Sequence, residues 1–259
     1  MDIVEYNPAN SIRHPWELVR FEFVLRLIRR YNKSNGKILI LDMGCGDCFF
    51  ALSLLTQKIP ATIIGIDPAY NPEDLVKKRQ EITHPDFHLF SKTEDAQHLL
   101  KGPVDFVLLL DVIEHIPDDI SFLKELTAYD FIDAHTRFVV TVPAYQSLFT
   151  SHDEFLLHYR RYSNRSLKKN LRSAGLEPVE TGYFFFILLP IRVLQKWKEK
   201  LSGKPRKNYG SGGWEHGKFL TGIVKGILLT DITITRFFKK TGINFPGLSN
   251  YTVCRKPVS

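Results

Sequence analysis

The chain has 259 residues, of which 44% are hydrophobic and 24% are charged. These proportions are ordinary for a globular protein, and the length suffices for one sizeable α/β domain with an insertion. Three cysteines are too few for a disulfide framework, and no segment reaches the roughly 20 apolar residues that a membrane-spanning helix needs. Because residues 1–10 carry two acidic residues and no long apolar run, we expect no signal peptide and a cytoplasmic protein.

The positive charge is concentrated in one segment. The formal net charge is +7, and residues 187–240 hold twelve Lys and Arg residues against three acidic residues. A basic segment of this kind favours an anionic partner, which could be a membrane surface, a phosphorylated substrate or nucleic acid.

A helix is predicted over residues 16–31, where apolar residues recur at helical spacing. Strands and helices then alternate as far as residue 142. The strands are expected at residues 37–43, 61–67, 84–90, 104–111 and 136–142, and the helices at residues 49–57, 72–81 and 121–129. The continuous apolar runs of these strands suit a parallel sheet covered on both faces, and the alternation indicates βαβ units with right-handed crossovers.

The last third of the chain has a different pattern. It predicts a helix at residues 166–174, a strand at 177–186, an apolar and basic stretch at 187–201, a flexible linker at 202–217, a second apolar and basic helix at 218–240 and a final strand at 250–256. We interpret residues 187–240 as an insertion between two late strands, within a single domain of residues 1–259.

A glycine-rich turn, Gly44-Cys45-Gly46, follows the first predicted strand and precedes a helix. Glycines there let the backbone approach a ligand, and the helix N-terminus presents free N–H groups. Phe49 stands where the dinucleotide fingerprint requires a third glycine, which weighs against NAD or FAD. Asp67 ends the second strand, where a carboxylate can accept both hydroxyls of a ribose. The pattern therefore predicts a nucleoside site.

Three motifs occur in order along this part of the chain, and they resemble those of class I S-adenosylmethionine-dependent methyltransferases of the type 11/12 group. They are ILDMGCGDCFFALSLL, IIGIDPA and VDFVLLLDVIEHIPDD. The resemblance covers residues 16–172 and the final strand. It implies a doubly wound, Rossmann-like, mostly parallel α/β sheet with an antiparallel last strand, a late helical insertion and S-adenosyl-L-methionine as the cofactor.

The resemblance also implies which residues hold the cofactor. They are Asp42, Gly44, Cys45, Gly46, Asp67, Pro68, Glu94, Asp95, Asp111 and Val112. The two glycines would pass beneath the methionine part, and Asp42 would hold its ammonium group directly or through water. Asp67 would bind the ribose, Glu94 or Asp95 would lie near the adenine amine, and Asp111 would face the amino-acid end.

Two cysteines occur within the cofactor turn. Cys48 replaces a glycine found in many relatives, and we expect it to alter local packing without abolishing binding. Cys45 and Cys48 form a C-x-x-C pair, a spacing that would also suit zinc or redox chemistry. The chain has no second pair to complete four ligands, so we expect no metal.

The segment after the fifth strand is expected to meet the substrate, because ligands of open α/β sheets lie beyond the carboxyl ends of the strands. His152 is the first candidate for a general base, since histidine titrates near neutral pH, and His115 is the second. The candidate substrate-binding residues are Asp153, His158, Arg160 and Arg161. Either arginine could bind a phosphate or carboxylate. The alternative is structural: His152 would bond a loop and the arginines would pair with Glu17 or Glu154.

The implied reaction is methyl transfer, which we expect to be O-methylation of a small-molecule, glycan or lipid-linked acceptor. The stretches HPWE, VPAYQSLFTSHDEFLLHYRRYS and FPGLSNYTVCRKP resemble a bacterial subgroup acting in such pathways. The alternatives are an RNA methyltransferase and a non-catalytic binding module. The fourth motif lacks the Asn/Asp-Pro-Pro-Tyr run of families that modify base amines, and no RNA-binding module is visible, so nucleic acid is not the expected partner.

The predicted insertion allows two interpretations. Its second helix carries apolar residues about every four positions: Phe219, Ile223, Ile227, Ile234 and Phe238. Such a helix could lie on a membrane with its lysines toward anionic head groups, or it could form a lid packed over the sheet.

Overall fold

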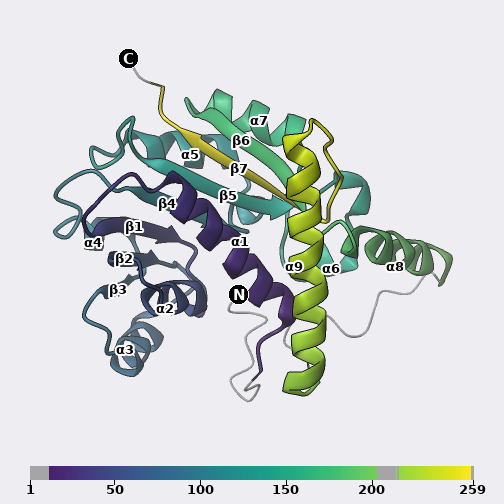
Figure 1. The fold of residues 1–259 in the computed structure, drawn as a ribbon. Coiled ribbons are helices and arrows are strands. Elements are labelled where there is room, and N and C mark those ends of the chain that lie inside the picture. Colours follow the sequence, from purple (N-terminus) through teal and green to yellow (C-terminus); the bar gives the residue numbers. More distant parts are fainter. Residues whose placement is uncertain (1–11, 203–213, 215, 258–259) are drawn as a thin grey trace.

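The computed structural model describes residues 12–202, 214 and 216–257, and a seven-stranded sheet lies at its centre (Figure 1). The strands follow the order β3-β2-β1-β4-β5-β7-β6. Their bounds are β1 (Ile38–Met43), β2 (Ala61–Ile66), β3 (Phe87–Phe90), β4 (Phe106–Leu110), β5 (Arg137–Pro143), β6 (Glu177–Phe184) and β7 (Ser249–Arg255). Strands β1 to β5 pair in parallel, whereas β7 is antiparallel to β5 and β6. The predicted Rossmann-like sheet with an antiparallel last strand is confirmed.

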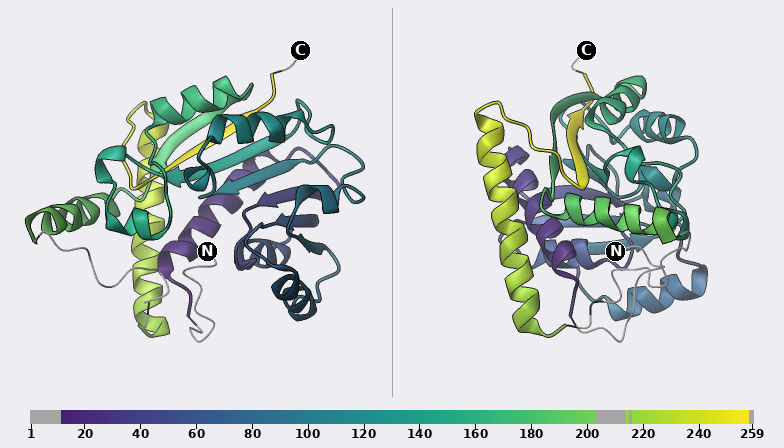
Figure 2. Two further views of the ribbon diagram at one scale, coloured as in Figure 1. Left: turned by 180° about the vertical axis from the view of Figure 1, so that it is seen from behind. Right: turned by 90° about the vertical axis from the view of Figure 1, so that its right-hand side faces the viewer.

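Helices cover both faces of this sheet. Helices α1 and α9 lie on one face and α5 and α7 on the other, while α8 extends outward beside α6 (Figure 2). The bounds are α1 (Pro15–Tyr31), α2 (Phe49–Leu55), α3 (Pro72–Glu81), α4 (Thr93–Ala96), α5 (Asp119–Ala128), α6 (Ser151–Phe155), α7 (Asn164–Ser173), α8 (Leu188–Ser202) and α9 (Lys218–Lys240). The two layers of helices explain why the central strands are apolar on both faces.

The predicted helices agree with the structure except at some ends. Helices α3 and α9 begin and end where the sequence pattern predicts. Helix α5 begins at Asp119, two residues earlier than expected, because the Asp118 side chain accepts a hydrogen bond from the Ser121 amide at 3.0 Å and caps the first turn. The pattern did not predict α4 and α6, which have four and five residues and are too short to show a helical period.

Two apolar cores hold the helices on the sheet. One core joins α1, α2 and α9 to one face, and includes Phe23, Leu54 and Ile232. The other joins α5 and α7 to the opposite face, and includes Leu123 and Leu171. Burial of these side chains on both faces fixes the sheet and therefore the loops at its carboxyl edge.

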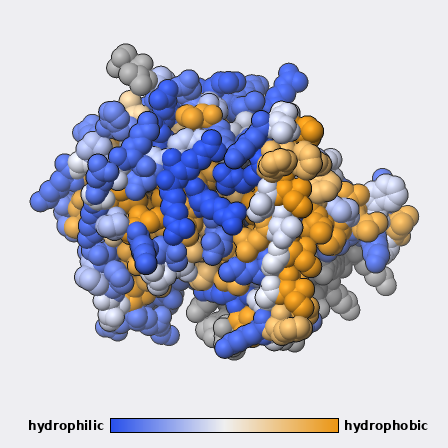
Figure 3. Space-filling view, in the orientation of Figure 1, coloured by the Kyte–Doolittle hydropathy of each residue, from blue (hydrophilic) through white to orange (hydrophobic). Residues whose placement is uncertain are grey.

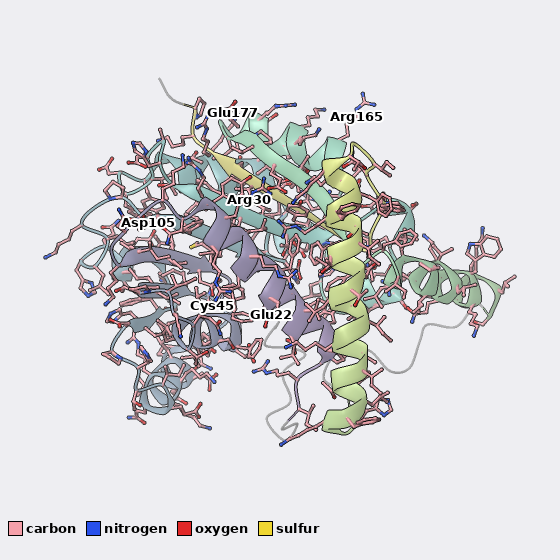
Figure 4. All side chains as sticks on the ribbon, in the orientation of Figure 1. Glu22, Arg30, Cys45, Asp105, Arg165 and Glu177 are labelled. Carbon is pink, nitrogen blue, oxygen red and sulfur yellow. The ribbon has the colours of Figure 1, made fainter. Side chains whose placement is uncertain are left out.

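Helices α8 and α9 follow β6 and precede β7 in the chain, at the position of the predicted insertion. Helix α9 packs along α1, where Glu22 lies beside it and pairs with Lys225 at 3.8 Å (Figure 4). Within the described residues, no helix combines the length and the apolar character needed to cross a membrane. The predicted linker over residues 202–217 lies outside the described residues, except for Ser202, Trp214, His216 and Gly217.

Candidate functional site

A cavity of about 830 Å³ lies at the carboxyl edge of the sheet. The turns after β1, β2 and β4 line it, and they carry most of the residues that the family resemblance assigns to the cofactor. The assigned residues in the lining are Gly44, Gly46, Asp67, Pro68, Glu94, Asp111 and Val112. Asp42, Cys45 and Asp95 are not part of the lining. The register of the strands explains the convergence, because Asp42 pairs with Gly65 of β2 and with Leu108 of β4, so the three strands end together.

The turn after β1 requires glycine at its first position. Gly44 has a φ of +69°, and a Cβ added there would lie 2.7 Å from Cγ2 of Val112. The turn after β1 therefore presses directly against the turn after β4, leaving backbone rather than side chain at the cavity wall. Cys48 has a φ of 67° and is fully buried. A cysteine in this left-handed conformation costs about 1–2 kcal/mol relative to glycine.

Asp67 joins the turns after β1 and β2. Its Oδ2 accepts a hydrogen bond from the Gly46 amide at 2.7 Å, and its Oδ1 accepts one from the Ala69 amide at 3.0 Å. Only 8% of the residue is exposed, at the cavity wall. Two backbone donors thus hold the carboxylate in one orientation at the cavity wall.

Asp42 lies beneath the glycine turn rather than in it. The residue is 2% exposed, and its Oδ2 has no hydrogen-bond partner within the described residues. Burial raises the pKa of Asp42 to about 7 because a charged carboxylate loses its hydration there. The Asp42 oxygen is buried and unsatisfied, and it lies behind the turn in which Gly44 leaves no room for a Cβ. A cofactor that carries an ammonium group fits this arrangement.

Helix α1 and its N-cap residue His14 contribute side chains that the sequence pattern did not indicate. His14, Trp16 and Arg20 line the cavity, and the Arg20 guanidinium lies 4.5 Å above the Trp16 ring. Arg20 also pairs with Asp111, which has a φ of 59° and accepts a hydrogen bond from Thr141 Oγ1 at 3.0 Å. The signal that could have found Arg20 is a charged residue on the apolar face of a helix, where it is 9% exposed.

The two acidic residues predicted near the adenine differ in position. Glu94 lines the cavity beside Lys92 and Thr93, and accepts a hydrogen bond from the Tyr129 hydroxyl at 3.0 Å. Two hydrogen bonds lower the pKa of Glu94: first the one from its own backbone amide, and then the one from the Tyr129 hydroxyl. Asp95 is exposed outside the lining. The structure thus separates Glu94 from Asp95 as the residue within reach of a ligand.

Histidines and arginines line the other end of the cavity. His115, His152, His158 and Arg161 all lie there, and Arg192 reaches it from α8. Burial, together with the nearby Arg192 charge, lowers the pKa of His152 to about 4. His152 is therefore neutral at pH 7, and a pKa this low also makes it a weak base. Arg192 was not predicted, because only the folding of α8 over the cavity brings it to Asp153 and Thr150, which precede it by 39 and 42 positions in the chain.

Asp153 lies behind the cavity wall and bonds three of the side chains that line this end. The residue is fully buried, and it bonds His158 Nδ1 at 3.0 Å, Arg161 Nε at 2.7 Å and Arg192 Nη2 at 2.9 Å. Burial alone would raise the pKa of Asp153, but the bonds from His158 and Arg161 lower it well below its usual range. Arg160 also lies outside the lining, where it pairs with Asp119 at 2.9 Å.

Glu114 is the least satisfied charged residue of the site. It lines the cavity although it is 0% exposed, and neither carboxylate oxygen has a hydrogen-bond partner within the described residues. Burial, with a further contribution from Asp111, raises the pKa of Glu114 well above its usual range. A buried, unpartnered carboxylate beside two histidines is unusual for a group with only a structural role.

Comparison with known proteins gives a consistent result. A family model described as a methyltransferase domain matches residues 16–181. Two proteins named ubiquinone biosynthesis O-methyltransferase are similar to the chain. One, from Actinobacillus pleuropneumoniae, is 29% identical over 40% of this chain and 47% of its own length. The other, from Vibrio parahaemolyticus, is 27% identical over 48% of this chain and 49% of its own length.

The chain therefore spans about half the length of the curated relatives it matches. Among solved structures, phosphoethanolamine N-methyltransferase 2 of Haemonchus contortus, in complex with S-adenosyl-L-methionine, has a TM-score of 0.54. It shares 12% identity and covers 92% of this chain and 53% of its own. This likeness shows a shared fold.

Proposed function

We propose that the chain, which belongs to the methyltransferase-domain family, transfers a methyl group from S-adenosylmethionine to an oxygen atom of a small acceptor. The family match confirms the predicted family, enzyme class and cofactor. The relatives named O-methyltransferases support oxygen as the acceptor atom and a small molecule as the acceptor.

One observation carries the proposal. One cavity is lined by the turn at Gly44, where a Cβ would not fit, by the carboxylate of Asp67, which two backbone amides hold, and by the neutral imidazole of His152. Bound S-adenosylmethionine supplies a methyl group that is already activated by its sulfonium. We place its ribose at Asp67, its methionine part over Gly44 and Gly46, and its ammonium group toward Asp42.

In this proposal the chain itself orients the acceptor and moves one proton. A ring nitrogen of His152, which lines the cavity and is neutral at pH 7, takes the proton of the acceptor hydroxyl. Arg161 lies at the same end of the cavity and orients an anionic group of the acceptor, while its pairing with Asp153 fixes the guanidinium. The side chains of α8 cover this end and limit the access of water.

We further propose that α8 and α9, the described helices of the predicted insertion, form a lid that also contacts a membrane or a lipid-linked acceptor. The inner side of α8 lines the cavity through Leu188, Ile191 and Arg192. Its outer side exposes Trp197 (67%) and Leu201 (86%). An apolar stripe also runs along the exposed face of α9 (Figure 3). Apolar surface on the outer side of the cavity cover suits an acceptor delivered from a lipid surface.

Transfer of a labelled methyl group tests the proposed function. The protein is incubated with a cofactor that carries a deuterated methyl group and with an extract of small molecules and lipids, and the products are analysed by mass spectrometry. We expect a labelled methyl ether in the small-molecule or lipid fraction. Asp67→Ala should lower cofactor affinity about ten- to hundredfold, because a charge-assisted hydrogen bond contributes about 1.5–3 kcal/mol.

The control for this experiment is Asp95→Ala, which changes an exposed carboxylate outside the cavity. The two alternatives give different results. Label in RNA alone would identify a nucleic-acid methyltransferase, whereas cofactor binding without any labelled product would identify a non-catalytic binding module. Unchanged cofactor affinity in Asp67→Ala would show that the ribose lies elsewhere.

A further inference from the structure

We propose that Glu114, His115 and His158 bind one divalent transition-metal ion in the cavity. One potential ligand atom from each residue lies within 4.8 Å of those of the other two. All three residues line the cavity, so an ion bound there would face the ligand space. This proposal replaces our expectation from the sequence that the chain binds no metal.

The state of Glu114 is the first observation that points to a ligand. Its side chain is fully buried, and both of its oxygens lack hydrogen-bond partners within the described residues. Burying a carboxylate without a partner is costly, and native proteins pair such groups or coordinate a metal with them. The arginines whose charges act on Glu114 are bonded elsewhere, Arg20 to Asp111 and Arg161 to Asp153. Neither arginine therefore pairs with Glu114, and its carboxyl group remains available to a bound cation.

The orientation of His158 is a second, independent observation. Its Nδ1 lies 3.0 Å from Oδ1 of the fully buried Asp153, which Arg161 and Arg192 hold in place. A carboxylate behind a histidine is the usual outer partner of a metal ligand, because it fixes the tautomer and makes the second nitrogen a better donor. In His158 this second nitrogen is Nε2.

Local structure places the three residues together. Glu114 and His115 lie in a short 3-10 turn, Ile113–His115, that begins three residues after the end of β4. The loop after α6 brings His158 to this turn, where the Tyr159 amide donates to the Glu114 carbonyl at 2.8 Å. The rings of His115 and His158 are then 4.6 Å apart at 82°. The backbone thus holds the three side chains on one wall of the cavity.

The chemistry of the ligands indicates the class of metal. Two imidazole nitrogens and one carboxylate suit Zn²⁺, Mn²⁺ or Fe²⁺, whereas Mg²⁺ and Ca²⁺ prefer oxygen ligands. Three protein ligands leave coordination positions open toward the cavity. Use of such a position to bind the acceptor oxygen would rest on the proposed methyl transfer, but binding of the metal does not.

Metal binding can be tested without cofactor or acceptor. Untagged protein is treated with a chelator and dialysed, and then titrated with ZnCl₂ by calorimetry and with CoCl₂ by visible absorption. We expect one ion per chain and a Co²⁺ spectrum with ligand-field bands. Glu114→Gln and His158→Ala should each weaken binding by about tenfold or more. His98→Ala, at an exposed site, and His152→Ala, in the same cavity, serve as matched controls and should bind normally.

Two results would overturn the metal site. One is wild-type protein that binds no more Zn²⁺ or Co²⁺ than a Glu114→Gln/His158→Ala double variant that is folded by circular dichroism. The other is unaltered binding and an unaltered Co²⁺ spectrum in folded His158→Ala or His115→Ala. Cofactor affinity is measured separately on the chelator-treated protein, so failure of the metal site and failure of the proposed methyltransferase function are distinguished.

Discussion

Asp42 shows how a single buried residue couples the cofactor turn to pH. Its carboxyl group is 2% exposed with one unpartnered oxygen, and its pKa is raised to about 7. The unfolded chain ionises this group near pH 4. Between these two pH values the folded chain holds a proton that the unfolded chain releases. The contribution of Asp42 to stability is therefore fully present below about pH 4 and is lost as the pH rises through 7.

Asp42→Asn should remove this dependence. We expect the wild-type protein to lose about 3 kcal/mol of unfolding free energy relative to the variant between pH 5 and pH 8. Urea denaturation at several pH values measures the difference. Asp95→Asn, at an exposed site, is the control and should follow the wild type. Parallel curves for wild-type protein and Asp42→Asn would show that Asp42 ionises normally in the folded chain.

His152 is the residue whose change should separate chemistry from binding. If it accepts the proton of the acceptor, His152→Ala should lower turnover by about 10²–10⁴-fold. Affinity for the cofactor should be unchanged, because the residues proposed to hold it lie on the turns after β1, β2 and β4 and on α4, whereas His152 lies on α6. Turnover and calorimetry on the same preparation measure both quantities, with His98→Ala as the control. Full turnover in His152→Ala would exclude His152 as the base.

Among the elements, α9 shows the least usual distribution of side chains. Its buried side carries Leu228, Asp231 and Ile232, while its exposed side carries a stripe of large apolar residues. The exposed residues of the stripe are Phe219 (84%), Ile223 (44%), Ile227 (46%), Ile234 (49%) and Phe237 (63%). Phe238, which the spacing placed in the stripe, instead packs against Phe245 at 5.5 Å. A water-soluble surface rarely keeps a continuous stripe of this kind uncovered.

The stripe predicts binding to anionic vesicles. We expect the protein to sediment with anionic vesicles more than with neutral ones, and salt to weaken the binding because charges are screened beyond about 10 Å at 0.1 M. The double change Ile223→Asp and Ile227→Asp should abolish vesicle binding and leave cofactor affinity and thermal stability nearly unchanged, since both side chains are exposed.

A matched control is available on the same helix. Thr230→Asp and Thr233→Asp add the same charge at exposed positions without removing apolar surface, so this pair should retain part of the binding. Wild-type protein that does not bind anionic vesicles at low salt would leave only the role of a lid for α8 and α9. A large loss of stability in the Ile223→Asp and Ile227→Asp protein would show that these residues pack within the fold.

At the scale of the whole molecule, less of the positive charge is available to an anionic partner than the composition suggests. Arg192 is bonded to Asp153, and Lys239 donates to Glu180 at 3.2 Å and to the Tyr251 hydroxyl at 2.6 Å. These two cations of the basic segment are therefore used inside the fold. Surface attraction to an anionic partner depends on the remainder, such as Lys198, Lys218 and Lys240, which are exposed.

The sequence by itself determined the order of the elements and the place of the glycine turn and Asp67 at the carboxyl edge of the sheet. The apolar runs that predict strands and the helical spacing that predicts helices are both local properties of the sequence. A chain in which parallel strands alternate with helices can then adopt few topologies. Asp67 and the glycine turn were predictable for the same reason. Each directly follows a strand, and parallel neighbouring strands end at one edge.

Only the tertiary structure decided which side chains meet at the end of the cavity lined by histidines and arginines. Asp153 was predicted to contact substrate, but it does not line the cavity, and its bonds to Arg161 and Arg192 join positions eight and 39 residues away. The pairing of Arg20 with Asp111 and the approach of His158 to Glu114 also depend on how α1 and the loop after α6 pack on the sheet. Such contacts carry no periodic signal, because they depend on the packing of distant segments and on which charges lose their water.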